Sequence, residues 1–140
     1  MRGLEVAGGV VTGVRVGDEV IEADAVVVAM GPWSSGAAEW LGLPVPVEPL
    51  KGQIVKVRPP RELAPFSFGR GGNYAAVKGP DVVYLGTTEE RSGFDRGITR
   101  EARDSILEFG VGFASVLAEA ELIEQTACLR PLSADGVPIM

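Results

Sequence analysis

The side chain best suited to chemistry in this sequence is Arg130, which stands between Leu129 and Pro131 in the stretch "TACLRPLSADGVPIM". An arginine in such surroundings is expected to be at least half-buried near the end of a strand, where its charge needs a partner. Its planar guanidinium matches a carboxylate through two parallel hydrogen bonds, which favours a clamp for an acidic substrate group. A structural ion pair with one of the 19 Asp and Glu residues is the alternative.

A second candidate site lies in "VVVAMGPWSSG", where an apolar run ends at Gly31 and is followed by Pro32, Trp33 and Ser34. Glycine lets a backbone approach flat rings closely, and the first N–H groups of a helix are free to face an anion. The pattern is therefore typical of a cofactor contact. A tight strand-to-helix turn with a core tryptophan explains the same residues, and both interpretations stay open.

Other conspicuous residues give weaker evidence for a functional site than these two segments. "GRGGN" at 69–73 lacks the lysine and Ser/Thr of a phosphate-binding loop and is interpreted as a hairpin turn. Tyr74, in the strand after that turn, is either a packing residue or a ligand contact, and Trp40 is assigned to the core. The single cysteine, Cys128, is predicted to be a small buried strand residue, because a nucleophilic thiol needs an activating base.

The amino-acid composition excludes several kinds of catalytic chemistry. The chain of 140 residues contains no histidine, which removes serine–histidine and cysteine–histidine catalysis and nearly every zinc site. Any redox or transfer chemistry is therefore expected on a bound cofactor. The net charge of −6 argues against nucleic acid as a partner. No apolar run is long enough to span a membrane, and the first residues do not resemble a signal peptide, so a cytoplasmic location is expected.

The first third of the chain predicts a hairpin with strands at 10–16 and 19–22 around a Gly17-Asp18 turn. The apolar run at 25–29 is typical of a strand buried on both faces of a parallel sheet. Only one short helix, at about 34–41, follows it, so this strand lacks the partners of a complete βαβ arrangement. A crossing between two domains is expected at 42–49.

The remaining chain predicts an antiparallel sheet with one long helix. Strands are expected at about 50–58, 73–78, 82–88 and 121–128. The helix is expected from Thr99, its candidate N-cap, with an apolar face that extends to Val116–Leu117. The fold class is therefore predicted as α+β: an antiparallel substrate-binding sheet with one long helix, plus an incomplete Rossmann-like portion.

Three segments in this order resemble the FAD-dependent amine and amino acid oxidoreductases, the family of glycine oxidase, D-amino acid oxidase and sarcosine oxidase, and they resemble glycine oxidase most. They are "IEADAVVVAMGPWSSGAAEWLGLPVPVEPLKGQIVKV", "NYAAVKGPDVVYLGTTEERSGFD" and "ACLRPLSADGVPIM". The resemblance covers nearly the whole chain. Two positions depart from the family pattern: Cys128 replaces a glycine before Leu-Arg, and Met30 replaces a small residue.

The resemblance implies roles for individual residues. Arg130 would bind the substrate carboxylate, with Tyr74 beside the substrate. The FAD would be lined by Gly31, Pro32, Trp33 and Ser34, with Val10 or Val11 near its adenine end. In this family a hydride passes from the substrate to FAD, so no protein side chain is expected to act as a catalytic base.

The resemblance also implies what is missing. The family holds the FAD pyrophosphate with a G-x-G-x-x-G turn, which this sequence lacks, so a missing N-terminal FAD-binding segment or a partner chain is expected to complete it. Residues 1–44 are assigned to a partial FAD-binding portion, 45–128 to substrate binding, and 129–140 to a return segment. Homo-oligomers would be a second way to cover the incomplete sheet.

The predicted function is a segment of a flavin-dependent oxidoreductase that oxidises a small amino acid or secondary amine by hydride transfer to FAD. Two alternatives remain: a non-catalytic module that binds small carboxylates, and a truncated remnant without activity.

Overall fold

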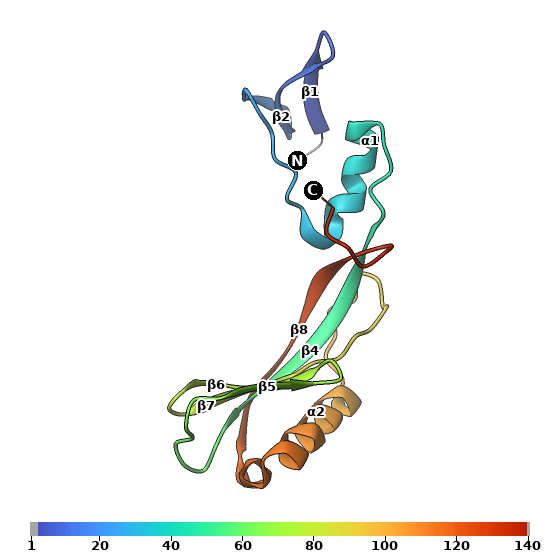
Figure 1. Cartoon of the computed structure of the whole chain (residues 1–140). Coiled ribbons are helices and arrows are strands. Elements are labelled where there is room, and N and C mark those ends of the chain that lie inside the picture. The colour runs from blue at the N-terminus through green and yellow to red at the C-terminus, as the bar shows by residue number, and fades with distance from the viewer. Residues whose placement is uncertain (1–2, 140) are drawn as a thin grey trace. The chain divides into compact units, whose positions relative to one another are not determined.

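The computed structural model describes residues 3–139, which form two compact units. Unit 1 comprises residues 1–48 and 131–140, and unit 2 comprises residues 49–130. The chain contains helices and antiparallel sheets, as the predicted α+β class requires (Figure 1). No helix among residues 3–139 is long and apolar enough to cross a membrane.

Unit 1 begins with a three-stranded antiparallel sheet in the order β1-β2-β3, made of β1 (Gly3–Ala7), β2 (Val10–Val16) and β3 (Glu19–Glu22). The predicted hairpin is confirmed, and its turn uses Gly17 at φ 62°, a conformation that glycine adopts without steric cost. The sequence analysis missed β1. The half-buried Trp40 ring lies over Gly3 of this strand, since a Cβ there would be 3.6 Å from Trp40 Cδ1.

The predicted strand at 25–29 is wrong. Residues 25–30 have no regular secondary structure, and Val27 is 88% exposed. A strand exists only as part of a hydrogen-bonded ladder, and no other described segment pairs with this one. The predicted short helix begins earlier than expected, as the 3₁₀ helix η1 (Gly31–Ala37), and continues as α1 (Ala38–Leu41).

Unit 2 is built on a five-stranded antiparallel sheet in the order β5-β6-β7-β4-β8. Its strands are β4 (Val47–Arg58), β5 (Ser67–Arg70), β6 (Asn73–Gly79), β7 (Val82–Gly86) and β8 (Glu121–Ser133). The four predicted strands of this region are confirmed, with longer ends for β4 and β8, while β5 was not predicted. The hairpin interpretation of "GRGGN" is also confirmed, because Arg70 pairs with Asn73 across the turn.

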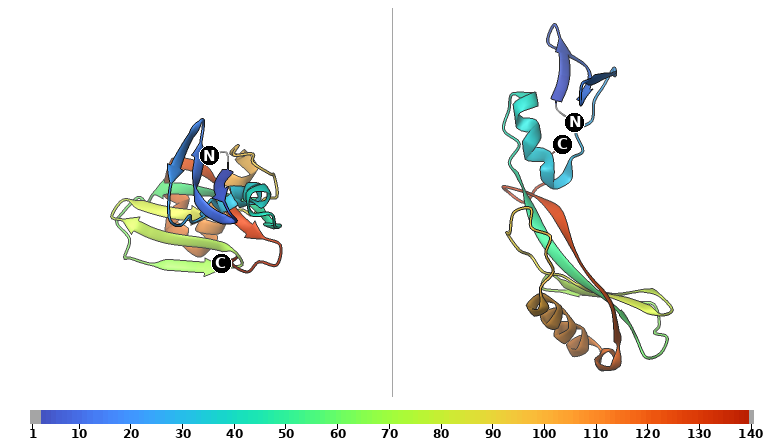
Figure 2. Two further views of the ribbon diagram at one scale, coloured as in Figure 1. Left: turned by 90° about the horizontal axis from the view of Figure 1, so that it is seen from above. Right: turned by 180° about the vertical axis from the view of Figure 1, so that it is seen from behind.

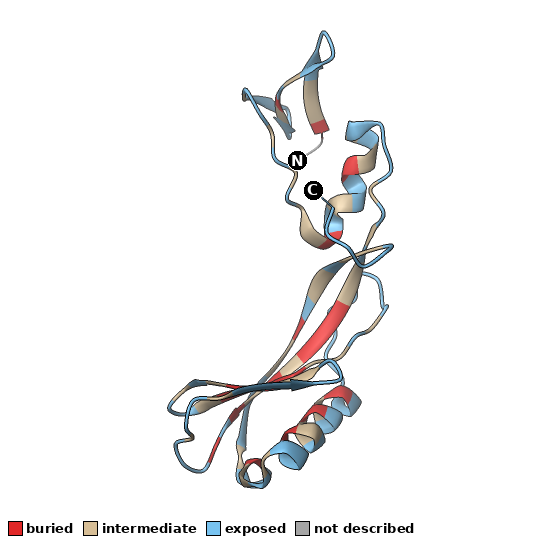
Figure 3. Cartoon of the chain, in the orientation of Figure 1, coloured by how far each residue is buried: buried red, intermediate tan, exposed pale blue. Residues whose placement is uncertain are grey.

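Helix α2 (Arg100–Phe113) covers one face of this sheet (Figures 1 and 2). Its N-cap is Thr99, whose side chain accepts a hydrogen bond from Ala102 N, as predicted. The helix ends at Phe113, earlier than predicted, and the chain continues as the 3₁₀ helix η2 (Ser115–Glu119). The core lies between α2 and the sheet (Figure 3). Its buried members are Val55, Val57, Ala75, Val83, Leu85, Ile106 and Leu117.

The other face of the sheet, opposite α2, is called the open face here. In an antiparallel ladder, directly paired residues point to the same face and successive residues alternate. Leu85 points toward α2, so Gly86 and its ladder partners Tyr74 and Ile54 belong to the open face. This open face carries the residues from which the candidate site is built.

Candidate functional site

Arg130 lies in β8, and its guanidinium is only partly engaged by the protein. Nη2 donates a hydrogen bond to the Thr88 backbone oxygen at 3.1 Å and lies 3.6 Å from Glu89 Oε1. The side chain is 43% exposed, yet its Nε is buried and has no hydrogen-bond partner among residues 3–139. The contact with Glu89 is an ion pair of the kind that the sequence analysis named as the alternative, and the exposed part of the guanidinium is what remains accessible to an anion.

Two glycines make room for the side chains on the open face. A Cβ on Gly52 would lie 2.9 Å from Thr87 Oγ1 and 3.2 and 3.3 Å from Arg130 Nη2 and Nε. The guanidinium therefore rests directly on the β4 backbone. Any larger residue at position 52 would have to displace it.

Tyr74 is held in a similar way on the neighbouring strands. It pairs with Gly86, and a Cβ at position 86 would lie 2.9 Å from both Tyr74 Cε1 and Ile54 Cγ2. Burial raises the pKa of the Tyr74 phenol, and the positive charge of Arg130 offsets part of this rise. The register places Tyr74 on the open face, and Arg130 lies against Gly52, two residues before Ile54 on the same face of β4, so the two predicted substrate-binding residues share this face.

A buried polar network supports the backbone that Arg130 contacts. Gln53 is fully buried, and its side chain donates to Glu90 Oε1 at 2.8 Å and accepts from Thr99 N and Gln125 Nε2, both at 2.9 Å. Its own backbone N–H donates to Thr88 Oγ1 at 3.0 Å. Gln53 therefore fixes the segment that follows β7, the start of α2 and β8 relative to one another.

Lys51 extends the network. Its buried ammonium lies 2.9 Å from both Glu90 Oε2 and Asp95 Oδ2, and it donates to the Gly97 oxygen at 3.2 Å. Sequence reasoning missed these residues, although the spacing of Lys51 and Gln53 on one strand face was a usable signal, because a charge in a predicted buried strand needs partners. The network supplies those partners from the segment between β7 and α2.

These contacts shift the pKa values of the ionisable members. The hydrogen bond to Glu90, followed by that to Asp95, raises the pKa of Lys51. Burial acts to raise the pKa of Glu90, but hydrogen bonds from Lys51, Thr88 and Gln53 outweigh it and lower the value. The backbone N–H of Gly97, with help from Lys51, lowers the pKa of Asp95. All three groups are therefore held in their charged forms.

The predicted cofactor residues lie in unit 1, but they do not all line the same cavity. Gly31 and Ser34 line an apolar cavity of about 730 Å³, together with Val27, Leu43 and the C-terminal segment 131–139. Gly31 has φ 55° and an open space where a Cβ would stand, so the backbone itself forms part of the wall. Pro32 is buried, Trp33 is 52% exposed, and neither lines this cavity.

Val10 and Val11 line a different groove in unit 1, of about 580 Å³. Three acidic residues contribute to its wall: Glu5, Glu22 and Asp24. The predicted residues at the adenine end are therefore not in the same cavity as Gly31 and Ser34.

The fit of these residues to FAD differs between parts of the cofactor. The open wall at Gly31 and the apolar lining of its cavity suit a flat ring system. The pyrophosphate is not matched: no Lys or Arg lines either cavity, and the Ser34 hydroxyl is already bonded to the Gly31 oxygen at 2.7 Å. The residues present thus fit the ring portion and require another donor set for the phosphates.

Cys128 was predicted to be buried, and this prediction is wrong. The thiol is exposed. Position 128 is two residues before Arg130 on β8, so the strand alternation places both side chains on the same, uncovered face.

The family described as "DAO: FAD dependent oxidoreductase" matches residues 1–140, and the chain belongs to this family. The prediction made from the three sequence segments is confirmed, as is the FAD dependence of the family to which they point.

Individual relatives show which members of the family this chain is similar to. Glycine oxidase of Pseudomonas putida is 35% identical over 93% of this chain. The crystal structure of glycine oxidase from Bacillus cereus matches 97% of the chain with a TM-score of 0.87 and 27% identity. Iminodiacetate oxidase from Chelativorans sp. BNC1 matches 94% with a TM-score of 0.83 and 30% identity. The chain spans only 36 to 38% of the length of these three proteins.

Proposed function

We propose that the open face around Arg130 binds the carboxylate of a small amino acid or secondary amine. The observation that carries this proposal is the Arg130 guanidinium itself, which is partly exposed and has a buried Nε without an acceptor among the described residues. The guanidinium lies against the backbone of Gly52, and the Tyr74 side chain lies on the same face of the sheet. The names of the relatives, glycine oxidase and iminodiacetate oxidase, agree with a substrate that carries a carboxylate beside an amine.

The proposed reaction is oxidation of that substrate, to which bound FAD supplies the capacity to accept a hydride from the α-carbon. In unit 1, Gly31 and Ser34 would hold the ring system through the apolar cavity. Pro32 would shape the turn between them, and the exposed Trp33 would contact the cofactor. Arg130 would bind and orient the carboxylate, which fixes the position of the reacting carbon without any protein base.

The assignment of Val10 and Val11 to the adenine end is also a proposal. Their groove is separate from the Gly31 cavity, and its acidic residues suit the hydroxyl groups of a ribose better than phosphates, because carboxylates accept hydrogen bonds from hydroxyls. Residues 1–44 are accordingly proposed as an FAD-binding portion, 45–128 as the substrate-binding portion and 129–140 as the return segment.

We further propose that FAD binding needs a segment or partner chain that supplies donors for the pyrophosphate. Exposed apolar side chains line or border the Gly31 cavity, including Val27 at 88%, Leu43 at 54% and Val137 at 58%. Apolar surface of this kind marks a contact with further protein. A second copy of the chain is the other candidate occupant.

The alternative function is a non-catalytic module that binds small carboxylates. It is favoured by one observation, the lack of cationic side chains in the two unit 1 cavities that would hold FAD phosphates. Flavin content separates the two functions, because only the oxidoreductase requires bound FAD.

The experiment combines the chain, FAD and a partner segment that carries a G-x-G-x-x-G turn, with glycine or sarcosine added in the absence of oxygen. We expect the visible absorbance of the flavin to bleach. Arg130→Gln should require about thirty- to several-thousand-fold more substrate, since removing one partner of a buried charge pair costs roughly 2 to 5 kcal/mol. Unchanged kinetics of this variant would contradict carboxylate binding at Arg130, and flavin that never binds would favour the non-catalytic module.

A further inference from the structure

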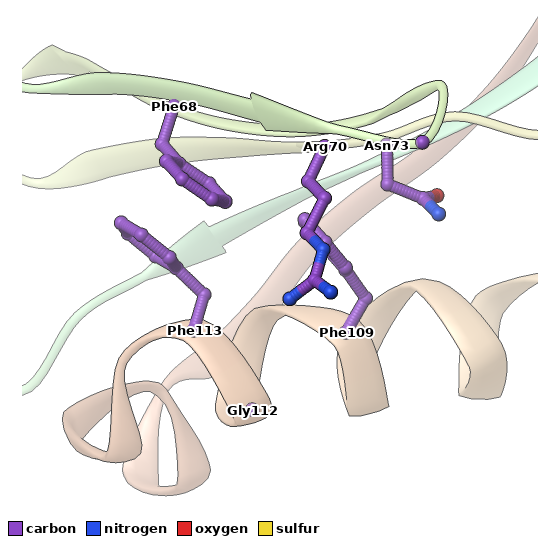
Figure 4. A pocket seen from close by; sticks show the side chains of 7 residues that line it. Phe68, Arg70, Asn73, Phe109, Gly112 and Phe113 are labelled. Atoms are coloured by element: carbon purple, nitrogen blue, oxygen red, sulfur yellow. The ribbon is translucent and has the colours of Figure 1, made fainter.

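A groove lies on the opposite side of the unit 2 sheet from Arg130, between the β5–β6 hairpin and the last turns of α2 (Figure 4). It has a volume of about 460 Å³, within the range of small-molecule sites. Its side chains come from two elements that are distant in the sequence. They are Phe68, Arg70 and Asn73 from the hairpin, and Phe109, Gly112 and Phe113 from the helix.

One part of the groove is polar and cationic. The Arg70 side chain extends from the hairpin toward α2, and the Asn73 side chain lies beside it on the same side of the sheet, with its amide turned away from the guanidinium in this view (Figure 4). No acidic residue lines the groove, and the Arg70 side chain has no ion pair or hydrogen bond to any of the residues 3–139. The guanidinium and the amide side chain each lack a protein acceptor among the described residues, and each can donate hydrogen bonds to a carboxylate.

The other part is aromatic. Phe68 and Phe113 stack with ring centroids 4.3 Å apart and an interplanar angle of 17°. They nevertheless remain 37% and 38% exposed, and Phe109 lies beneath the Arg70 side chain (Figure 4). Phenylalanines that stay this exposed after packing on each other offer apolar area to a ligand.

Gly112 gives an independent reason to regard the groove as a site. A glycine inside a helix costs about 1 kcal/mol relative to alanine, so it needs a compensating use. At Gly110 the use is internal packing, because a Cβ there would lie 2.7 Å from Leu85 Cδ1. At Gly112 nothing lies within 4 Å of the Cβ position, so no contact inside the chain requires the glycine. Its missing side chain deepens the groove.

We propose that this groove, named the Arg70 groove, binds a small aromatic monocarboxylate. The carboxylate would accept hydrogen bonds from Arg70 and Asn73, and the ring would lie against the phenylalanines over Gly112. Asn73 and Tyr74 are consecutive in β6 and therefore point to opposite faces of the sheet. The Arg70 groove is thus separate from the open face and does not depend on the proposed oxidoreductase function.

The test uses the 140-residue chain and phenylacetate, with phenylethanol as the uncharged analogue, followed by NMR of the backbone amides. We expect saturable shifts at Asn73, Phe109 and Gly112 with phenylacetate and about tenfold weaker binding of phenylethanol. Arg70→Gln should weaken phenylacetate binding by about tenfold or more, which is the loss of one charge-assisted hydrogen bond. Arg70→Lys should restore part of it.

Two further variants test the groove and keep the fold intact. Gly112→Ala should stabilise α2 and still weaken phenylacetate binding, because its methyl group enters the groove. Lys78→Gln, which removes an exposed cation from the same strand as Asn73, should leave phenylacetate binding at the groove unchanged. The proposal is overturned if shifts appear only around Tyr74 and Arg130, if the shifts do not saturate, or if Arg70→Gln binds phenylacetate as tightly as the unmodified chain.

Discussion

Replacing Gly52 with alanine should reduce carboxylate binding at the open face by moving Arg130, with little effect on the rest of the fold. The new Cβ would lie 2.9 Å from Thr87 Oγ1 and 3.2 Å from Arg130 Nη2. The first distance is shorter than real Cβ contacts, so something must shift. The Thr87 hydroxyl must therefore turn away, and the Arg130 guanidinium, at 3.2 and 3.3 Å from the new Cβ and at the end of a flexible side chain that is 43% exposed, must also give way by a few tenths of an ångström.

The magnitude follows from the contacts that are lost. A displaced guanidinium would give up its bond to the Thr88 oxygen and its alignment with a bound carboxylate. Hydrogen bonds to charged groups contribute about 1.5 to 3 kcal/mol, so affinity for a carboxylate should fall by roughly tenfold to one-hundred-and-fiftyfold. The unfolding free energy should change less, because overpacking in β4 is partly offset by alanine's better fit to a strand.

The assay is an NMR titration of the chain with glycolate, a carboxylate without an amine, in which the Tyr74 amide is followed. Gly69→Ala is the matched control, because it lies in the same sheet and its Cβ would meet only the Asn73 oxygen at an ordinary 3.5 Å. Urea unfolding of both variants separates binding from stability. If Gly52→Ala and Gly69→Ala bind glycolate equally well, the guanidinium does not rest on Gly52 in the way described.

Three further outcomes are expected. Gly86→Ala should push the Tyr74 ring aside and weaken glycolate binding a few-fold, measured by the same titration; an unaltered Tyr74 environment would contradict this. Gln53→Leu should lower the free energy of unfolding in urea by about 2 to 4 kcal/mol, since buried donors lose their acceptors, and a neutral result would show that the network is not structural. Because the pKa values of Glu90 and Asp95 are lowered in the folded state, their stabilisation should be complete above their unfolded values near about 4.3 and 3.9 and should be lost as the pH falls further. The urea midpoint measured across this range should therefore drop on the acid side, and a flat profile would contradict the assigned network.

Most of the sheet and helix was predictable because its signals are local. The cap at Thr99, the turn at Gly17 and the β-branched runs of β4 and β7 each depend on neighbouring residues. The strand β5 was missed because all four of its residues are exposed and show no apolar alternation. The predicted strand at 25–29 failed for the opposite reason: its residues favour a strand, but no described segment pairs with it.

The candidate site was predictable residue by residue but not as an arrangement. Arg130 and Tyr74 were predicted from their types and from the family resemblance, and the structure places both on the open face, whereas the residues that support them were not predicted. Gln53 contacts groups 35 to 72 positions away, and spacing along the chain does not indicate such contacts. Cys128 was placed inside because the sequence offers no histidine to activate it as a nucleophile, a reason that carries no information on which face of the sheet is covered, and the structure leaves its face open.

The most direct test of carboxylate binding is the NMR signal of the Arg130 Nε–H group, recorded while glycolate is added to the 140-residue chain. This nitrogen is buried and has no acceptor among residues 3–139, so it should report any change at the guanidinium. The predicted result is a saturable shift of this signal that needs about tenfold more glycolate, or a still higher concentration, in Gly52→Ala. A signal that stays unchanged at saturating glycolate would show that Arg130 is a structural residue and not a carboxylate clamp.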